Sequence, residues 1–454
     1  MSTTRTRRDG FFLLLLGSAI FLTLGTSLEN VSPVALIDFK PLYFSARCLL
    51  HGCDPYNQSQ VLRLYKAEEG QNPPGSARDR EVVTRYVYFP TSFVFTIPLA
   101  VLPYGPAHLL WMALIFGALV LASFLMWNLA AESAPLLAGA LVFLLLANSE
   151  LQVIDGNVGA IAIGLSILAA WCFVKERHAA AGIVCLAAGL ALKPQDTGLV
   201  WLYFLAAGGV YRKRALQTLA VLAALSVPVV LWVTAVSPHW MQELYTSIAA
   251  LSAPGGINDP SPSSTGGHGI GMIISLQSAL SFFRDDPGFY NPASYLLCAA
   301  PLLTWLYTAL RSRATPTRAW LALAAIAALS LLPVYHRQGD AALLLLSVPA
   351  CAMLWARGGA AARPAVLVTG AAFVLTGDLT WAVIYALIGN LHPVLHGLWV
   401  PVFIAALLFP VPFTLLAMGV FYLWVYAQGS LGAQRVAEID AEANAGKTIA
   451  EQAE

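Results

Sequence analysis

The sequence predicts an all-α, polytopic membrane protein with about 12 (11–13) transmembrane helices and two long outer loops. Three observations predict this class. Of the 454 residues, 58% are hydrophobic and only 11% are charged, whereas a soluble protein of this length would need more charged surface. Apolar segments of near-spanning length follow one another along most of the chain. Lysine and arginine also gather between alternate segments, as they do at the cytoplasmic ends of membrane helices.

The apolar segments carry few or no charges. The first, 11–28, is about long enough to cross a bilayer. A signal peptide is the rival interpretation, but no convincing small-x-small cleavage site follows, so we expect an uncleaved first helix. The last segment is too long for one untilted span, although Pro410 and Pro412 could kink it. The twelve segments are 11–28, 107–128, 135–148, 158–174, 179–192, 196–211, 215–236, 292–310, 319–335, 341–356, 364–381 and 397–427.

The basic residues predict the orientation. Alternation of the spans from residue 158 onward puts all the basic clusters on one side, which we take as cytoplasmic. The opposite side of this region has only Lys193, Arg284 and Arg337. The clusters are Lys175/Arg177, Arg212/Lys213/Arg214, Arg311/Arg313/Arg318 and Arg357/Arg363, with Arg5, Arg7 and Arg8 before the first span.

With the N-terminus and Lys175 both on the cytoplasmic side, the number of membrane crossings between the first span and Lys175 must be odd, and the segments 107–128, 135–148 and 158–174 supply three. This count leaves the short apolar piece 90–103 without a crossing, so we expect a half-buried or re-entrant segment on the outer side. The alternative is that it crosses, which would give thirteen spans. We therefore expect one transmembrane domain over 1–427, with outer loops at 29–90 and 237–291, and a cytoplasmic tail at 428–454.

The cysteines carry a smaller signal. Cys48 and Cys53 lie close together in the first outer loop and could pair in an oxidising compartment. The other four lie in apolar segments, where a small buried residue is the default interpretation.

Polar residues at the segment ends all fall on the predicted outer side. Structural polar residues would be scattered over both sides, so this convergence indicates one shared site. The residues are Asp38, Asp155-Gly156-Asn157, Lys193-Pro194-Gln195, His268 and His336-Arg337-Gln338-Gly339-Asp340.

Asp38 is the candidate general base. It stands between Ile37 and Phe39, and a carboxylate among apolar neighbours tends towards a raised pKa, which suits a base. The alternative is a helix N-cap for a helix that runs through Tyr43 and Arg47.

Lys193 and the cluster around Arg337 are the candidate anion-binding groups. The segment before Lys193 would rise only about 21 Å, so the lysine should lie within the outer half of the membrane, where charges pair or bind ligand. Snorkelling to the interface is the alternative. His336 and Arg337 suit phosphate, because arginine offers a planar fork of donors, whereas an internal Arg337–Asp340 ion pair is the alternative.

The sequence lacks a Walker loop, a dinucleotide fingerprint and a Gly-x-Ser-x-Gly elbow. Residues with the spacing of a metal site are also lacking, so we predict no metal ligands and no certain cofactor, although Asp38 and Asp340 could share a divalent metal. The net charge of +1 gives no reason to expect a nucleic-acid partner.

An ordered set of short motifs resembles glycosyltransferase family 87 of the GT-C superfamily. Phe89 and the shortened Gly156-Asn157 element depart from the family pattern. The set comprises Asp38-Phe39, Tyr43-Phe44-Ser45-Ala46-Arg47, Gly52-Cys53-Asp54-Pro55-Tyr56, Tyr88-Phe89-Pro90, Pro98-Leu99 through Leu102-Pro103, Gly156-Asn157-Val158, Ala191-Leu192-Lys193-Pro194-Gln195, Tyr211-Arg212-Lys213-Arg214 and Tyr335-His336-Arg337 with Asp340.

The resemblance implies a GT-C-like bundle that transfers a sugar from a polyprenyl-phosphate sugar to a lipid-linked or glycan acceptor. Membrane lipids would surround it, the membrane would be a bacterial inner membrane, and the site would face the periplasm. Mannose is the first candidate sugar, as in α-1,2-mannosyltransferases. Asp38 would be the base, and Lys193, His336 and Arg337 would stabilise the leaving phosphate. Supporting or acceptor-contacting candidates are Arg47, Tyr43, Asn157, Gln195, Asp340 and His268.

Two alternatives stay open. The same site could transfer arabinofuranose or another pentosyl or hexosyl unit, because such donors differ only in the pocket shape that they require. A lipid-glycan flippase or transporter is the rival class, but it would tend to show internal repeats and polar residues in both membrane halves.

Overall fold

The computed structural model describes residues 3–32, 35–69, 83–261, 273–388 and 409–428. Within these ranges helices are the only extended regular elements, and a single bridge pair joins Ile273 to Arg337. The prediction of an all-α protein is therefore confirmed.

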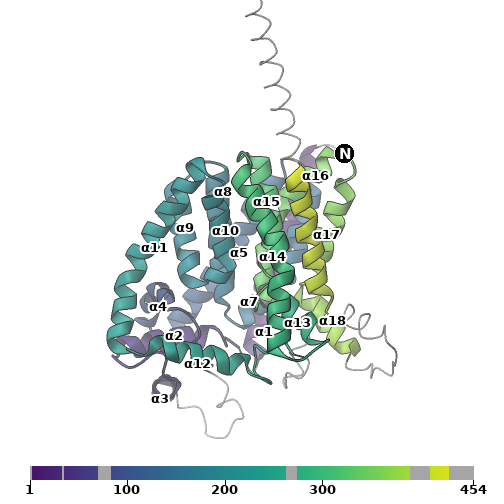
Figure 1. Ribbon diagram of the computed structural model, residues 1–454. Coiled ribbons are helices and arrows are strands. Elements are labelled where there is room, and N and C mark those ends of the chain that lie inside the picture. The colour runs from purple at the N-terminus through teal and green to yellow at the C-terminus, as the bar shows by residue number, and fades with distance from the viewer. Residues whose placement is uncertain (1–2, 33–34, 70–82, 262–272, 389–408, 429–454) are drawn as a thin grey trace, which may run out of the picture.

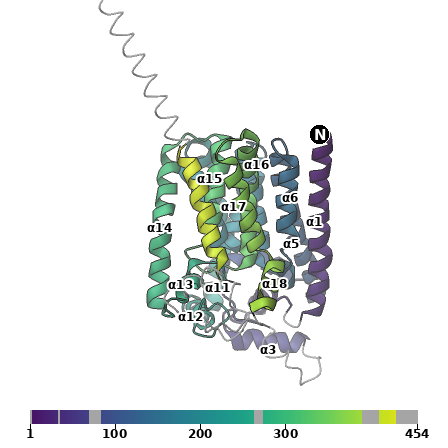
Figure 2. The same ribbon diagram turned by 90° about the vertical axis from the view of Figure 1, so that its right-hand side faces the viewer.

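Six of the described helical stretches are long and apolar enough to cross a membrane, so the chain is a multi-pass membrane protein. They run side by side, with α1 and α14 at opposite edges of the bundle in Figure 2. The six are α1 (Thr3–Val31), α5 (Tyr104–Ala130), α11 (Gly209–Val236), α14 (Pro287–Arg311), Gln338–Arg357 and Pro410–Gln428.

Shorter helices pack among and around the long ones. They rise only about 18–26 Å, so twelve full spans are not confirmed and stay a prediction. Nearly all of α8 and α15 is buried, because small and branched apolar residues face neighbouring helices on every side. The short helices are α6 (Pro135–Leu146), α8 (Val158–Val174), α9 (Ala179–Leu192), α10 (Pro194–Ala206), α15 (Pro316–Leu329) and α17 (Ala362–Leu375).

Two predicted spans differ in their detail. The segment 319–335 ends its helix at Leu329, and the chain then passes Pro333 in a non-helical conformation. The segment 341–356 is not one α-helix but the 3₁₀ helix η3 (Gln338–Ser347) followed by α16 (Val348–Arg357). Pro349 explains the change, because its ring would clash with the carbonyl group four residues earlier in a continuous α-helix. Of the last segment, residues 397–408 lie outside the described residues.

Small elements cover one end of the bundle, which we call the outer end (Figure 1). The N-terminus and the loops that hold Lys175 and Arg313 lie at the other end, which we call the basic end. The elements at the outer end are α2 (Phe39–Leu50), α3 (Gln58–Glu69), η2 (Pro90–Ser92), α4 (Phe93–Ala100), α7 (Leu151–Ile154), α12 (Trp240–Ser252), α13 (Leu276–Ser281) and α18 (Asp378–Ile388).

The piece 90–103 does not form a spanning helix. Its helix α4 rises only about 12 Å and packs against α2 at the outer end. Tyr43 and Arg47 of α2 donate hydrogen bonds to the carbonyl groups of Leu102 (2.7 Å) and Ala100 (2.8 Å). Buried packing of this kind is what a half-buried segment requires.

The first outer loop contains a disulfide between the two cysteines that could pair. Cys48 at the end of α2 bonds to Cys53 just beyond it. Arg47 forms an ion pair with Glu68 of α3 at 2.9 Å. Together these links hold α2 and α3 as one platform at the outer end.

Candidate active site

A cavity of about 320 Å³ opens at the outer end, beneath α2 and α12. Segments from both halves of the chain contribute to its wall. Of the residues that the sequence predicted, it is lined by Asp38, Asn157, Lys193, Gln195, Arg337 and Asp340.

Asp38 stands immediately before α2 and faces this cavity. Its backbone amide donates to the carbonyl of Asp155 at 2.9 Å, which fixes the start of α2 against the loop before α8. Asp38 does occupy the N-cap position of α2, as the N-cap alternative expects, but its side chain makes no capping hydrogen bond. Among the described residues, no side chain or backbone amide donates a hydrogen bond to its carboxylate, so this acceptor is available to a ligand.

The surroundings of Asp38 favour proton uptake. Burial raises the pKa of Asp38 above its ordinary value, although the charges of Arg337 and Lys193 act in the opposite direction. Burial and the negative charge of Asp38 raise the pKa of Asp155 to about 7, again against Arg337. Carboxyl groups whose pKa is raised in this way can accept a proton close to neutral pH.

Lys193 lies between two consecutive helices at the edge of the cavity. It ends α9 and precedes Pro194 of α10 in an extended conformation, because a residue before proline avoids the helical region. Its ammonium contacts Asp340 and lies 3.1 Å from Asp196. The side chain is only 10% exposed, so snorkelling to the surface is excluded.

Gly159 makes room for this buried pair. A Cβ atom at Gly159 would lie about 2.9 Å from the Asp340 carboxylate and about 3.0 Å from the Lys193 ammonium. The first turn of α8 therefore approaches the ion pair with its backbone. Asn157 caps the same turn by accepting a hydrogen bond from the Gly159 amide at 2.6 Å.

Asp196 is a site residue that was not among the residues predicted from the sequence. It is fully buried between Lys193 and His336, with 3.4 Å from His336 Nε2 to the Asp196 carboxylate. A signal was present, since an acid three residues after Lys193 shares its helix face. His336 itself is fully buried and does not line the cavity, so the structure does not place it where it would touch a phosphate.

Asp196, His336 and Asp340 offer ligand atoms within 4.8 Å of one another, an arrangement that could hold a metal ion. However, the ammonium of Lys193 already contacts both carboxylates. A divalent ion would have to displace this ammonium, so the residues fit a resident lysine better than a metal.

Arg337 directs its guanidinium to the cavity from the start of η3. It donates to the carbonyl of Ile257 at 2.9 Å and to the hydroxyl of Tyr335. Asp340 accepts a hydrogen bond from the Arg337 backbone amide at 3.1 Å, but within the described ranges the two side chains form no ion pair. The alternative of an internal Arg337–Asp340 pair is therefore wrong.

The remaining predicted residues lie elsewhere. Tyr43 and Arg47 do not line the cavity but brace α2 against α4 and α3. His268 lies outside the described residues. Arg85, Tyr88 and Phe89 line the cavity from the segment before η2, although none of them was among the predicted site residues.

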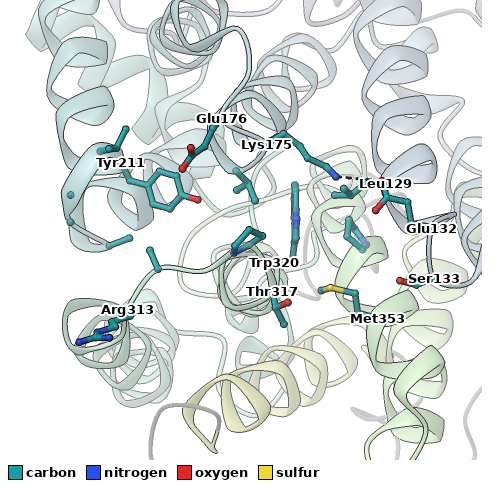
Figure 3. Close-up of a pocket in the computed structure, with 18 residues that line it drawn as sticks. Leu129, Glu132, Ser133, Lys175, Glu176, Tyr211, Arg313, Thr317, Trp320 and Met353 are labelled. Atoms are coloured by element: carbon teal, nitrogen blue, oxygen red, sulfur yellow. Dashed lines mark hydrogen bonds and ion pairs between the residues drawn. The ribbon is translucent and has the colours of Figure 1, made fainter. Parts of the chain in front are cut away.

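A larger cavity of about 810 Å³ lies at the basic end (Figure 3). Lys175 and Glu132 form an ion pair across it at 3.4 Å, and Tyr211, Arg313 and Trp320 also line it. Its charged side chains reach solvent, since Glu132 is 63% exposed. Among the described residues that line it, none forms a buried carboxylate cluster, so the outer cavity is the candidate active site.

Comparison with known proteins identifies the family. The model of glycosyltransferase family 87 matches residues 86–334, which is more than half of the chain. The matched region includes Asn157, Lys193 and Asp196 but begins after Asp38 and ends before Arg337. No curated protein and no solved structure matches the chain. The match shows that this multi-pass membrane protein belongs to glycosyltransferase family 87 and is a membrane glycosyltransferase.

Proposed function

We propose that the protein transfers a sugar, mannose in the first instance, from a polyprenyl-phosphate sugar to a lipid-linked or glycan acceptor. The observation that carries this proposal is the available Asp38 carboxylate, which lines the same cavity as Lys193 and Arg337. A base and two cations in one small cavity suit a reaction in which a hydroxyl loses a proton while a phosphate leaves.

In the proposed reaction, the acceptor hydroxyl attacks the anomeric carbon of the donor sugar. Asp38 takes the hydroxyl proton as the new carbon–oxygen bond forms. The bond between the anomeric carbon and the phosphate oxygen breaks, and polyprenyl phosphate leaves with the bonding electrons. A single displacement of this kind inverts the anomeric configuration.

Lys193 and Arg337 are proposed to stabilise the leaving phosphate. Arg337 offers a planar fork of donors, and Lys193 is held in place by two carboxylates before the substrate arrives. Preorganised charges of this type need little rearrangement during the reaction. His336 would contribute indirectly, because it contacts Asp196 and not the cavity.

The membrane context supports a lipid-borne donor. The cavity lies at one end of a bundle of apolar helices, so a lipid phosphate could reach it while its hydrocarbon tail stays in the membrane. We propose that this end faces the periplasm of a bacterial inner membrane, since the basic loops lie at the opposite end. We also propose a single GT-C-like domain over 1–427, with twelve spans and a cytoplasmic tail at 428–454.

The test uses the purified full-length protein in lipid, with polyprenyl-phosphate mannose and extracted membrane lipids. We expect mannosyl transfer that falls by about a hundredfold to ten-thousandfold in Asp38→Asn, because general-base catalysis contributes on this order. Asp285→Asn is the matched control, since Asp285 is exposed and lies away from the cavity. Transfer that survives Asp38→Asn would contradict the base assignment.

A second donor separates the alternatives. Transfer only from polyprenyl-phosphate arabinofuranose would replace mannose as the sugar but keep the mechanism. Movement of labelled lipid between leaflets without any transfer would instead support a flippase and overturn the proposal.

A further inference from the structure

Helix α12 lies across the outer end of the bundle (Figure 1). It carries a stripe of exposed apolar side chains. Met241 is 67% exposed, Tyr245 is 74% exposed and Ile248 is 43% exposed. Their spacing of four and three residues places them on one face of the helix. Large apolar side chains in this arrangement are rarely left to water.

The face of α12 next to this stripe is fixed to the protein. Leu244 and Ser247 are buried, and the ring of Trp240 packs 5.9 Å from the ring of Tyr56. Leu251 and Ser252 line the cavity that contains Asp38. The rotation of α12 about its axis is therefore set by packing, and the apolar stripe is presented outward.

The helix that precedes α12 in the chain is a spanning helix with exposed apolar residues of its own. Three residues separate α11 from α12, and α11 is among the least buried of the spans. Near its outer end, Val227 is 53% exposed and Leu231 is 64% exposed. The exposed apolar residues of α11 and those of α12 are thus joined by one short connection at the outer end.

At its far end, the stripe of α12 meets the cavity. Ile248 is both exposed and part of the cavity wall, and Phe89, which is 53% exposed, also lines the cavity. Both side chains are thus exposed apolar groups at the cavity that also contains Lys193 and Arg337. This junction suits a molecule with a hydrocarbon tail and an anionic head.

We propose that Met241, Tyr245 and Ile248 form the docking surface for the isoprenoid chain of a lipid-borne substrate, whose phosphate enters the cavity past Ile248 and Phe89. The proposal rests on the proposed function, because it assumes a polyprenyl-phosphate substrate. From Met241 to Ile248 the stripe is about 10 Å long, so it holds only the first part of a long chain. The rest of the chain lies in the outer leaflet along α11.

The test is photo-crosslinking with a radiolabelled long-chain polyprenyl phosphate, using the full-length protein in lipid vesicles. A photoreactive phenylalanine analogue replaces Tyr245 in one variant. In the control variant it replaces Tyr295, which is 48% exposed on α14. We expect labelling at position 245 that excess unlabelled polyprenyl phosphate removes, and only non-competed background at position 295.

Binding affinities provide the second measurement. We expect the double variant Met241→Gln/Tyr245→Gln to bind long-chain polyprenyl phosphate about tenfold more weakly, while its affinity for dimethylallyl phosphate, whose single isoprene unit is too short to extend along the stripe, stays unchanged. Leu296→Gln is the control, because Leu296 is 74% exposed on α14. Saturable binding with equal labelling at positions 245 and 295, or with an unaltered double variant, would overturn the docking surface alone. A wild-type protein without saturable binding of any prenyl phosphate would overturn the proposed donor as well.

Discussion

The two ends of the bundle hold cavities that differ in what they bury. The basic-end cavity is the larger, at about 810 Å³ against about 320 Å³, yet its Lys175–Glu132 pair is open to solvent. The outer cavity has Lys193, Asp196 and Asp340 almost fully enclosed beside it. Burial of charge is costly unless each group is paired, so an enclosed cluster indicates a site more reliably than volume does. Removal of the lysine from a lysine–carboxylate pair is therefore expected to have different effects on stability and activity at the two ends.

The largest effect is expected when the buried Lys193 is replaced, in comparison with the partly exposed Lys175. Lys193→Gln leaves Asp196 and Asp340 without their cation, which should destabilise the fold by about 3–5 kcal/mol and abolish transfer. Lys175→Gln at the basic end should change stability by less than about 1 kcal/mol, because its ion pair is exposed. Thermal unfolding in detergent and initial rates of transfer measure both quantities. Similar losses for the two variants would show that burial does not distinguish the two ends.

Asp196 gives the next effect. Asp196→Asn keeps the shape of the side chain but removes a charge that faces Lys193 and His336. Since Asp196 does not line the cavity, we expect it to position Lys193, so kcat should fall by about ten- to a hundredfold with little change in the KM for acceptor. Asp196→Glu should recover part of the rate. A rise in acceptor KM with kcat intact would contradict a positioning role.

Asp196 illustrates which features of the site could be predicted from the sequence and which could not. Polar residues at segment ends predicted the outer site, because helix alternation alone decides on which side such residues lie. The partner of Asp196 is His336, from a segment 140 residues further on, and no local pattern encodes that contact. For the same reason His336 was expected at a phosphate, although packing of η3 against α15 encloses it. The lengths of helices such as α8 and α15 could not be predicted from local patterns either. Both helices are surrounded by neighbouring helices, so neither has to be long enough to cross the bilayer in contact with lipid.

A smaller effect is expected from a change that alters no charge. Gly159→Ala would place a methyl group about 3 Å from the Lys193–Asp340 pair, so the pair must separate or α8 must shift. We expect about a tenfold loss of transfer rate with the protein still folded. Gly117→Ala in α5 is the control, because a methyl group there meets nothing within 4 Å. Equal rates in both variants would show that the approach of α8 to the ion pair does not matter for transfer.

The smallest and most specific effect is a shift of the pH profile. Asp38 must be deprotonated to act as a base, so the rate should fall as the pH drops through the raised pKa of its carboxyl group. Burial raises this pKa and the positive charge of Arg337 lowers it, so Arg337→Gln should raise it further. The acid limb of kcat/KM should then move to higher pH, while Arg284→Gln, an exposed arginine that does not line the cavity, should leave the limb in place. An acid limb that moves to lower pH in Arg337→Gln would mean that a group other than Asp38 accepts the proton. At the basic end, Arg313→Gln should leave the limb where it is, because Arg313 lines the other cavity and not the one that contains Asp38.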